Sequence, residues 1–367
     1  MKSSFFINTP NNKIPKNKTI DILKNSDAFV FHLSLKTYKP TPLVSLPNLA
    51  KKYKVGNIYI KDESFRFGLN AFKGLGALYA ISQLLKNNPN IETFCTATDG
   101  NHGRAVAYSA KYFNKKAVVF VPKGTTNQRI EAIKNEGARV EVVDGNYDDT
   151  CSYAEKLTKK NDWVLVQDTA WQGYEEIPAL IVAGYLTLFK EIEETCKSKI
   201  DIVFLQAGVG SFAGAGIYHY LQKYGTNRPK IVIVEPNEAD AILTSLQKNE
   251  ITTSLGNSQT IMAGLNCGTP SLGVWDLLKY GVDVSIKIDD KYAKEAMREL
   301  YTPNETDKRI ISGESGASGL AGFISIINED EFKPLIKKLN INKKTNILFI
   351  STEGATDIKM FNEILSI

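Results

Sequence analysis

Short apolar runs alternate with helix-length amphipathic segments along most of this chain, and this alternation is the feature that most constrains its fold. Many of the apolar runs are continuous, as in strands that are buried on both faces of a sheet. A chain that repeats strand and helix in this way is predicted to be an α/β protein with parallel sheets. The nine predicted strands are residues 58–62, 93–98, 117–121, 139–143, 163–167, 201–207, 230–235, 282–288 and 346–351, after a polar N-terminal arm.

The number of strands favours two packed sheets over one. Residues 93–167 contain four strand–helix steps of their own, which predicts a second, smaller sheet. Ligands of open α/β sheets bind outside the carboxyl ends of the strands. The residues that follow each strand are therefore the candidates for a functional site.

Composition excludes several classes of protein. The longest apolar run, Ile177 to Phe189, is shorter than the roughly 20 residues that span a bilayer, and the first residues have no signal-peptide pattern. We expect a cytoplasmic protein with no membrane partner. The four cysteines lack C-x-x-C spacing and there are three histidines, which makes a zinc site or a disulfide framework unexpected. The net charge of +5 is dispersed, so no nucleic-acid partner is predicted.

A glycine-rich turn follows the strand at residues 201–207 and leads into a helical pattern. Its residues, Gly208 to Gly214, would present backbone N–H groups and the positive end of a helix dipole to a phosphate. The same turn satisfies G-x-G-x-x-A, and Glu235 ends the next strand, where an acid would hold the ribose of a dinucleotide. A turn whose glycines serve only packing is the third interpretation.

Lys73 lies in FGLNAFKGLG, where a helix is predicted to begin with Asn70 as its cap. Its neighbours are apolar or small, and such surroundings would lower the pKa of the amine by disfavouring its charged form. Gly74 and Gly76 would let another body approach. This lysine is a candidate for Schiff-base chemistry; the alternative is a lysine that reaches out of an ordinary amphipathic helix.

Polar groups also follow other strands. Asp99 to Arg104 forms a possible anion-binding nest, or a simple helix cap, with His102 as a structural residue. Asp168 and the pair Ser351 and Thr352 end two further strands. A lysine for an aldehyde, a helix start for a phosphate and a hydroxyl for a ring nitrogen are the groups that pyridoxal phosphate requires. A dinucleotide would leave Lys73 unexplained.

These residues resemble the fold-type II pyridoxal-phosphate enzymes, the group of the tryptophan synthase β-subunit and the serine and threonine dehydratases. The resemblance runs from about Thr41 to Asp357 through TPLVSLPNLA, IYIKDES, NAFKGLG, GNHG and GVGSFAG. The more specific wording, above all DGNHGR and QDTAW, resembles the diaminopropionate ammonia-lyase family. It implies two open, mostly parallel twisted sheets flanked by helices. The cofactor would lie in the cleft between a large domain (1–92 and 179–367) and a small domain (93–178).

The resemblance also assigns roles to individual positions. Lys73 matches the lysine that binds the cofactor covalently, and Asn101 matches the residue whose amide meets the 3-hydroxyl group. Ser351 or Thr352 matches the hydroxyl that faces the pyridine nitrogen. The cofactor-binding positions implied in this way are Phe72, Lys73, Asn101, Gly208, Val209, Gly210, Ser211, Phe212, Gly264, Ser351 and Thr352.

Asp99 departs from the wider group, in which dehydratases and serine racemase carry serine before G-N-H. With Asp168 it would supply two carboxylates, which suit a diamino substrate. The implied reaction is α,β-elimination of D- and L-2,3-diaminopropionate to pyruvate and two molecules of ammonia. We expect Asp99 to serve the D isomer and Asp168 or Lys73 the L isomer, in a homodimer without metal. A serine or threonine dehydratase, a racemase, an NAD-dependent oxidoreductase and a non-catalytic carrier of the cofactor are the alternatives.

Overall fold

The chain forms two sheets, as a computed structural model shows for residues 3–98, 100–145, 147–257, 259–303 and 305–366. The larger sheet has seven strands in the order β1-β10-β9-β8-β11-β3-β2, and the smaller has four in the order β6-β5-β4-β7. The strands are β1 Ser4–Ile7, β2 Leu43–Ser45, β3 Asn57–Asp62, β4 Thr93–Ala97, β5 Lys116–Pro122, β6 Arg139–Val143, β7 Val164–Leu165, β8 Ile202–Gln206, β9 Lys230–Pro236, β10 Val284–Ile288 and β11 Asn346–Ser351.

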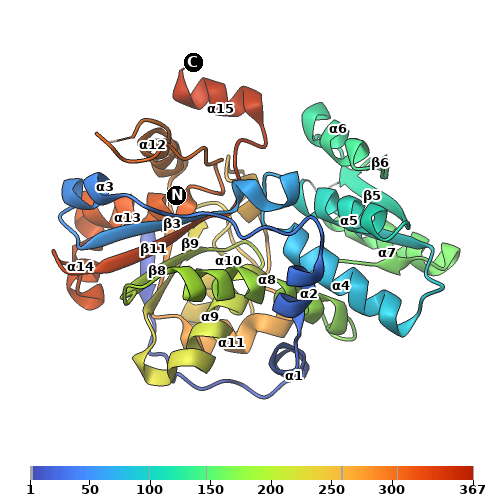
Figure 1. The fold of residues 1–367 in the computed structure, drawn as a ribbon, viewed down its shortest axis with the longest axis horizontal. Helices are drawn as coiled ribbons and strands as arrows, with labels where there is room; N and C mark the ends of the chain where they lie inside the picture. The colour runs from blue at the N-terminus through green and yellow to red at the C-terminus, as the bar shows by residue number, and fades with distance from the viewer. Residues whose placement is uncertain (1–2, 99, 146, 258, 304, 367) are drawn as a thin grey trace.

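Helices flank both sheets, and Figure 1 shows the small sheet with α5, α6 and α7 at one end of the molecule, on the right. The helices are α1 Lys18–Lys24, α2 Ala28–Ser34, α3 Pro47–Lys52, α4 Gly74–Asn87, α5 Asn101–Tyr112, α6 Asn127–Asn135, α7 Tyr147–Asn161, α8 Glu176–Thr195, α9 Ser211–Tyr224, α10 Ala241–Lys248, α11 Trp275–Gly281, α12 Asp290–Tyr301, α13 Ser318–Asn328, α14 Lys333–Leu339 and α15 Ile358–Leu365. The predicted α/β fold with two mostly parallel sheets is confirmed. The domain limits at residues 92 and 178 stay a prediction.

All nine strands predicted from the apolar runs are present, and two more strands lie at the edges of the large sheet. β1 pairs antiparallel with β10, and β2 pairs antiparallel with β3. The description of the N-terminus as a polar arm was therefore wrong for Ser4–Ile7. An antiparallel edge strand is covered on one side only, so it lacks the long apolar run that marks a central parallel strand.

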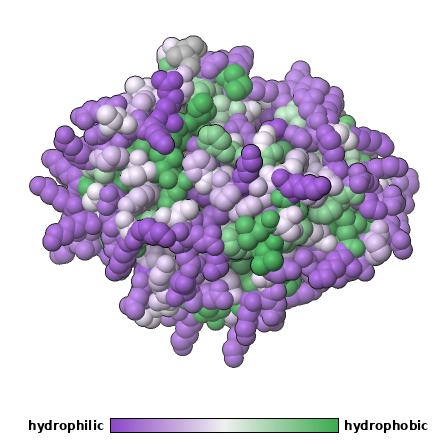
Figure 2. Space-filling model, in the orientation of Figure 1, coloured by the Kyte–Doolittle hydropathy of each residue, from purple (hydrophilic) through white to green (hydrophobic). Residues whose placement is uncertain are grey.

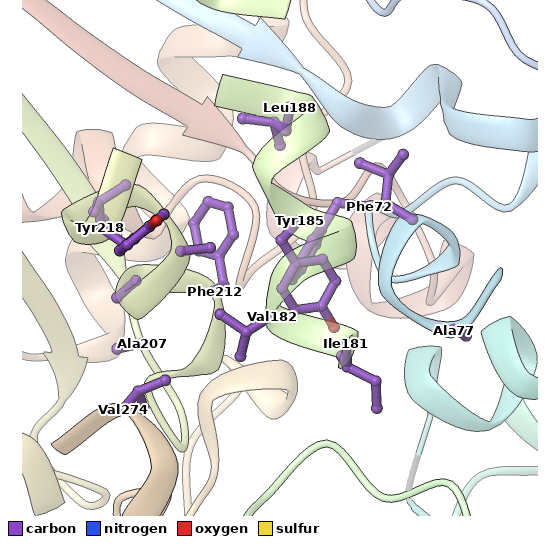
Figure 3. Packing of buried hydrophobic residues seen from close by; sticks show 14 of the residues in the cluster. Phe72, Ala77, Ile181, Val182, Tyr185, Leu188, Ala207, Phe212, Tyr218 and Val274 are labelled. Carbon is purple, nitrogen blue, oxygen red and sulfur yellow. The ribbon is translucent and has the colours of Figure 1, made fainter. Parts of the chain in front are cut away.

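Aromatic side chains pack together around the start of α9. The ring centroid of Phe72 lies 4.8 Å from that of Tyr185 on α8 and 4.8 Å from that of Phe212 on α9. Figure 3 shows these three rings together, among further apolar side chains from α8 and α9. This cluster fixes the residue before Lys73 against the helix that starts at the glycine-rich turn.

Close contact between α4 and α8 depends on two glycines. A Cβ atom on Gly76 would lie 2.6 Å from Ile181 Cγ2, and one on Gly184 would lie 2.7 Å from the Cα of Gly76. The expectation that Gly76 lets another body approach is met by a helix of the same chain. Since real Cβ atoms do not come so close to their neighbours, larger residues here would push the two helices apart.

Polar and charged residues dominate the face of the molecule drawn in Figure 2, with separate apolar patches between them. Among the exposed large apolar side chains are Val30 and Leu33 on α2, which are 67% and 54% exposed. In the part of the chain that the structure describes, no helix has both the length and the apolar character to cross a membrane.

Candidate active site

A cavity lies where the carboxyl ends of strands from both sheets meet. It is bounded by the start of α4, the start of α5, the segment after β7, the turn between β8 and α9, and the segment after β11. The residues that line it are Phe72, Lys73, Asn101, Asp168, Tyr185, Gln206 to Ala213, Gly264, Leu265, Cys267, Ser315, Thr352 and Glu353. Most of the predicted site residues are therefore brought together, although they are spread over 281 positions of the sequence.

Lys73 directly precedes α4 and takes a helical conformation itself, with φ −60° and ψ −20°. Asn70 does not cap this helix, as we expected from the sequence, but has a left-handed backbone with φ 56°. Its Nδ2 donates to the carbonyl of Ala355 at 3.0 Å, and its own carbonyl accepts from the Gly354 N–H at 3.0 Å. The turn before Lys73 is thus tied to the segment that follows β11.

The Lys73 ammonium forms an ion pair with Asp168, whose Oδ2 lies 2.6 Å from Nζ. Burial by itself would lower the pKa of Lys73, but the Asp168 carboxylate outweighs burial and the pKa is raised. The predicted lowering of this pKa was therefore wrong for this form of the protein. Burial would likewise raise the pKa of Asp168, but its interactions with His102 and Lys73 outweigh burial and the pKa is lowered.

His102 lies beside the ion pair. Its imidazole is buried, with Nε2 2.8 Å from the carbonyl of Val166 and Nδ1 3.7 Å from Asp168 Oδ2. Burial lowers the pKa of His102, so the ring is kept neutral near neutral pH. Because a carbonyl oxygen only accepts, Nε2 carries the proton and holds the ring in place. This geometry agrees with the structural role predicted for His102.

The turn from Gly208 to Phe212 has the geometry of an anion cradle. Gly210 adopts φ +91°, which L residues rarely do, and α9 begins at the next residue with its N–H groups beside the cavity. A Cβ atom on Gly208 would lie 2.7 Å from Cys267 Sγ. Ser211 Oγ donates to the carbonyl of Asp168 at 2.7 Å. The helix N-terminus and the absence of side chains at Gly208 and Gly210 fit a phosphate group.

The two hydroxyl residues at the end of β11 are placed differently. Thr352 lines the cavity, and its Oγ1 accepts from Gln206 Nε2 at 3.1 Å. Ser351 is buried outside the lining, and its Oγ donates to Ser312 Oγ at 2.8 Å. Of the pair left open by the sequence, Thr352 therefore faces the cavity.

Asn101 and Gly264 complete the predicted set. Asn101 is the first residue of α5, and its Nδ2 donates to Glu353 Oε2. The N–H of Gly264 donates to Ser315 Oγ at 2.9 Å. Asp99, the predicted acid before Gly100, lies outside the residues that the structure describes.

Glu235 does not face the cavity. Its carboxyl oxygens accept from the backbone N–H groups of Ile242 and Leu243 at 2.7 and 2.8 Å, at the start of α10. Burial raises its pKa to about 8. Glu235, the acid that would have to bind the ribose of a dinucleotide, instead accepts hydrogen bonds from the start of α10. This removes the main support for the dinucleotide alternative.

Eight lining residues were not among the predicted site residues: the apolar Ala207, Ala213 and Leu265, and the polar or ionisable Tyr185, Gln206, Cys267, Ser315 and Glu353. Gln206 could have been found, because it is a polar residue at the end of an otherwise apolar strand. Glu353 and Ser315 belong to strand and helix ends with the same small, polar composition as the predicted site. Tyr185 carries no such signal, since its helix is apolar for packing reasons. Within the described ranges no three His, Cys, Asp or Glu side chains are placed to hold a metal.

Comparison with known proteins agrees with this geometry. Residues 35–352 match a family model described as "Pyridoxal-phosphate dependent enzyme". The diaminopropionate ammonia-lyase of Escherichia coli K12 is 41% identical, over 99% of this chain and 97% of the relative. That of Salmonella typhimurium LT2 is 39% identical over 92% of this chain and 91% of the relative. An L-threonine dehydratase of Staphylococcus epidermidis is 29% identical over 89% of this chain.

Solved structures give the same result. The E. coli diaminopropionate ammonia-lyase in complex with an aminoacrylate-PLP azomethine reaction intermediate superposes with a TM-score of 0.91 at 40% identity, covering 99% of this chain and 97% of that one. A structure of the same enzyme with D-serine has a TM-score of 0.92 at 38% identity, with the same coverage. The chain belongs to the pyridoxal-phosphate dependent enzymes and, within them, to the diaminopropionate ammonia-lyase family.

Proposed function

We propose that this chain is a pyridoxal-phosphate dependent lyase that converts D- and L-2,3-diaminopropionate to pyruvate and two molecules of ammonia. The observation that carries the proposal is the Lys73–Asp168 ion pair, 2.6 Å long, in a cavity that is also lined by the glycine-rich start of α9. The family membership and the two ammonia-lyase relatives support the same reaction.

The side chains of the cavity fit the cofactor group by group. The N–H groups from Gly208 to Phe212 would hold its phosphate, and Asn101 its 3-hydroxyl group. Thr352 would face the pyridine nitrogen with a neutral hydroxyl. Bound pyridoxal phosphate supplies an aldehyde that condenses with amines and a conjugated ring that accepts electrons from the α-carbon.

Proton transfer would fall to the acids and the amine of this chain. Lys73 would hold the cofactor and, once displaced by the substrate amine, stay beside Asp168 as a proton acceptor for the α-hydrogen of the L isomer. Asp168 would keep Lys73 oriented and stabilise the positive charge that Lys73 gains with the proton. Asp99, which directly precedes Gly100 in the sequence, would act on the D isomer. The carboxylates of Asp99 and Asp168 would also attract the second ammonium group of the substrate.

The visible spectrum and the products of the purified protein test this function. We expect a yellow protein that releases pyruvate from both enantiomers of diaminopropionate, and much less from serine or threonine. Faster turnover of serine or threonine than of diaminopropionate would assign the chain to the dehydratases. Interconversion of enantiomers without ammonia would assign it to the racemases, and a colourless protein would exclude the cofactor. A yellow protein that releases no ammonia would be a carrier.

We further propose that the chain is a homodimer in the cytoplasm and that its large domain comprises residues 1–92 and 179–367 and its small domain 93–178. The exposed Val30 and Leu33 on α2 would gain from burial against a second copy. The cysteines of the described residues form no disulfide, which fits a reducing compartment. Light scattering during gel filtration should give twice the mass of one chain.

A further inference from the structure

The backbone around Glu353 connects the site to the segment that carries Lys73. Glu353 lies two residues after β11 and forms an isolated antiparallel bridge with Ala71. Its carbonyl accepts from the Gly313 N–H at 3.0 Å. The position of Glu353 is therefore fixed from both sides, by the turn before Lys73 and by the segment before α13.

Both carboxyl oxygens of Glu353 are engaged. Oε2 accepts from Asn101 Nδ2, and Oε1 accepts from the N–H of Ser315 at 3.3 Å. The side chain is 6% exposed, and it forms part of the wall of the main cavity and of a second, adjoining pocket. Arg129 lines that second pocket and opposes the effect of burial, which still raises the pKa of Glu353.

The contact with Glu353 determines which end of the Asn101 amide can reach a ligand. A carboxamide has one accepting oxygen and an NH2 group with two donors. A carboxylate only accepts, so it holds the amide by its NH2 group. The second N–H of that group is then oriented for donation to another oxygen, and the amide cannot turn over without losing its bond to Glu353.

We propose that Glu353 is a positioning residue that keeps Asn101 as a hydrogen-bond donor toward the 3-hydroxyl oxygen of the cofactor. This inference rests on the proposed function, since it requires pyridoxal phosphate in the main cavity. Glu353 follows the hydroxyl residues Ser351 and Thr352 in the sequence, and its carboxylate links the end of β11 in the large sheet to the start of α5 beside the small one. The two sheets would thus act together on one cofactor oxygen.

A double-mutant cycle on cofactor binding tests the proposal. Apoprotein is titrated with pyridoxal phosphate, and the dissociation constant and the pH dependence of the visible band are measured. We expect Glu353→Ala and Asn101→Ala each to weaken binding roughly tenfold, as loss of one charge-assisted hydrogen bond does. The double variant should bind about as well as either single variant, because Glu353 acts through Asn101. Effects that multiply in the double variant would overturn the proposal.

Conservative variants separate positioning from general support of the fold. Glu353→Gln keeps an oxygen that can accept from Asn101, and it should restore cofactor affinity and the pH dependence of the band. Asp307→Asn is the matched control, because Asp307 is a buried acid that accepts from the N–H groups of Asn48 and Leu49 and lines neither pocket, and it should leave both unchanged. If Glu353→Gln had the same cofactor affinity and visible band as Glu353→Ala, the proposal would be contradicted.

If Glu353→Ala does not fold, a second variant tests the proposal. Glu353→Asp retains the charge but withdraws the carboxylate by one methylene group, so it should weaken cofactor binding in the same way as alanine. Wild-type affinity in Glu353→Asp would overturn the proposal. If the wild-type protein binds no pyridoxal phosphate, both the proposed function and this inference are wrong. If it binds the cofactor but the effects of Glu353→Ala and Asn101→Ala multiply in the double variant, only this inference is wrong.

Discussion

Lys73 Nζ and Asp168 Oδ2 lie 2.6 Å apart, although the two residues belong to different sheets. Lys73 follows β3 of the large sheet, and Asp168 follows β7 of the small one. The pair also connects to the phosphate-type turn, because the carbonyl of Asp168 accepts from Ser211 Oγ. The position of one acid relative to the reactive amine therefore depends on how the two sheets are packed.

Replacing Asp168 should lower the rates with the two enantiomers to different extents. We expect Asp168→Asn to lower pyruvate release from the L isomer by about 100-fold or more, as loss of a group that takes part in proton transfer does. Release from the D isomer should fall less, because Asp99 serves that isomer in our proposal. Initial rates with each enantiomer, on protein whose cofactor content is verified by absorbance, measure the effect.

The matched control for this variant is Asp144→Asn, since Asp144 is an exposed acid after β6 of the same sheet that pairs with the exposed Lys123. It should keep both rates. An Asp168→Asn protein that holds its cofactor and turns over the L isomer within tenfold of wild type would exclude Asp168 from proton transfer.

Asp99→Asn should affect the two enantiomers in the opposite way, with the larger loss of rate on the D isomer. An amide at this position cannot remove a proton, so we expect pyruvate release from the D isomer to fall by about 100-fold and release from the L isomer to be largely kept. Coupled assays of pyruvate from each enantiomer measure both. Full activity on the D isomer would refute the assignment of Asp99.

The sequence predicted the strands and the main chemistry because both depend on local patterns. Continuous apolar runs marked the nine parallel strands, and glycine or hydroxyl residues after them marked the cofactor groups. The resemblance to a known family then assigned Lys73 and Asn101 to the site. The edge strand β1 was missed because its short run gives no sign of the β10 strand it pairs with.

Features that depend on packing could not be read from the sequence. The pKa of Lys73 was predicted with the wrong sign, because the apolar neighbours are local but Asp168 is 95 positions away. Gly76 serves the contact with α8, which requires knowing where that helix lies. Glu353 was visible as a strand-end acid, but its bond to Asn101 requires the structure.

A methyl group at Gly210 should impair the phosphate cradle. Its φ of +91° is unfavourable for alanine, and a Cβ atom would lie 2.9 Å from Leu278 Cδ1. We expect Gly210→Ala to weaken pyridoxal phosphate binding by tenfold or more in titrations of the apoprotein.

Gly173→Ala is the matched control, because Gly173 has φ +86° with open space around it. It should lose about 1 kcal/mol of stability and keep its cofactor affinity. Equal affinity of the two variants would show that the turn tolerates a side chain.

His32 should make the protein sensitive to acid. Its buried imidazole lies 2.7 Å from Thr187 Oγ1 and 3.1 Å from the carbonyl of Leu75, and burial, together with the Arg66 guanidinium, lowers its pKa to about 3. Between pH 6.5 and about 3 the unfolded chain binds a proton at this position that the folded protein does not. The free energy of unfolding should therefore fall by up to about 1.4 kcal/mol per pH unit as the pH is lowered through this range.

His32→Gln should lose stability at pH 7.5, where the neutral imidazole is favourable, and the difference in unfolding free energy from wild type should narrow toward pH 4.5. Urea unfolding at four pH values measures this difference, and a constant difference across the range would show that His32 does not cause the acid sensitivity.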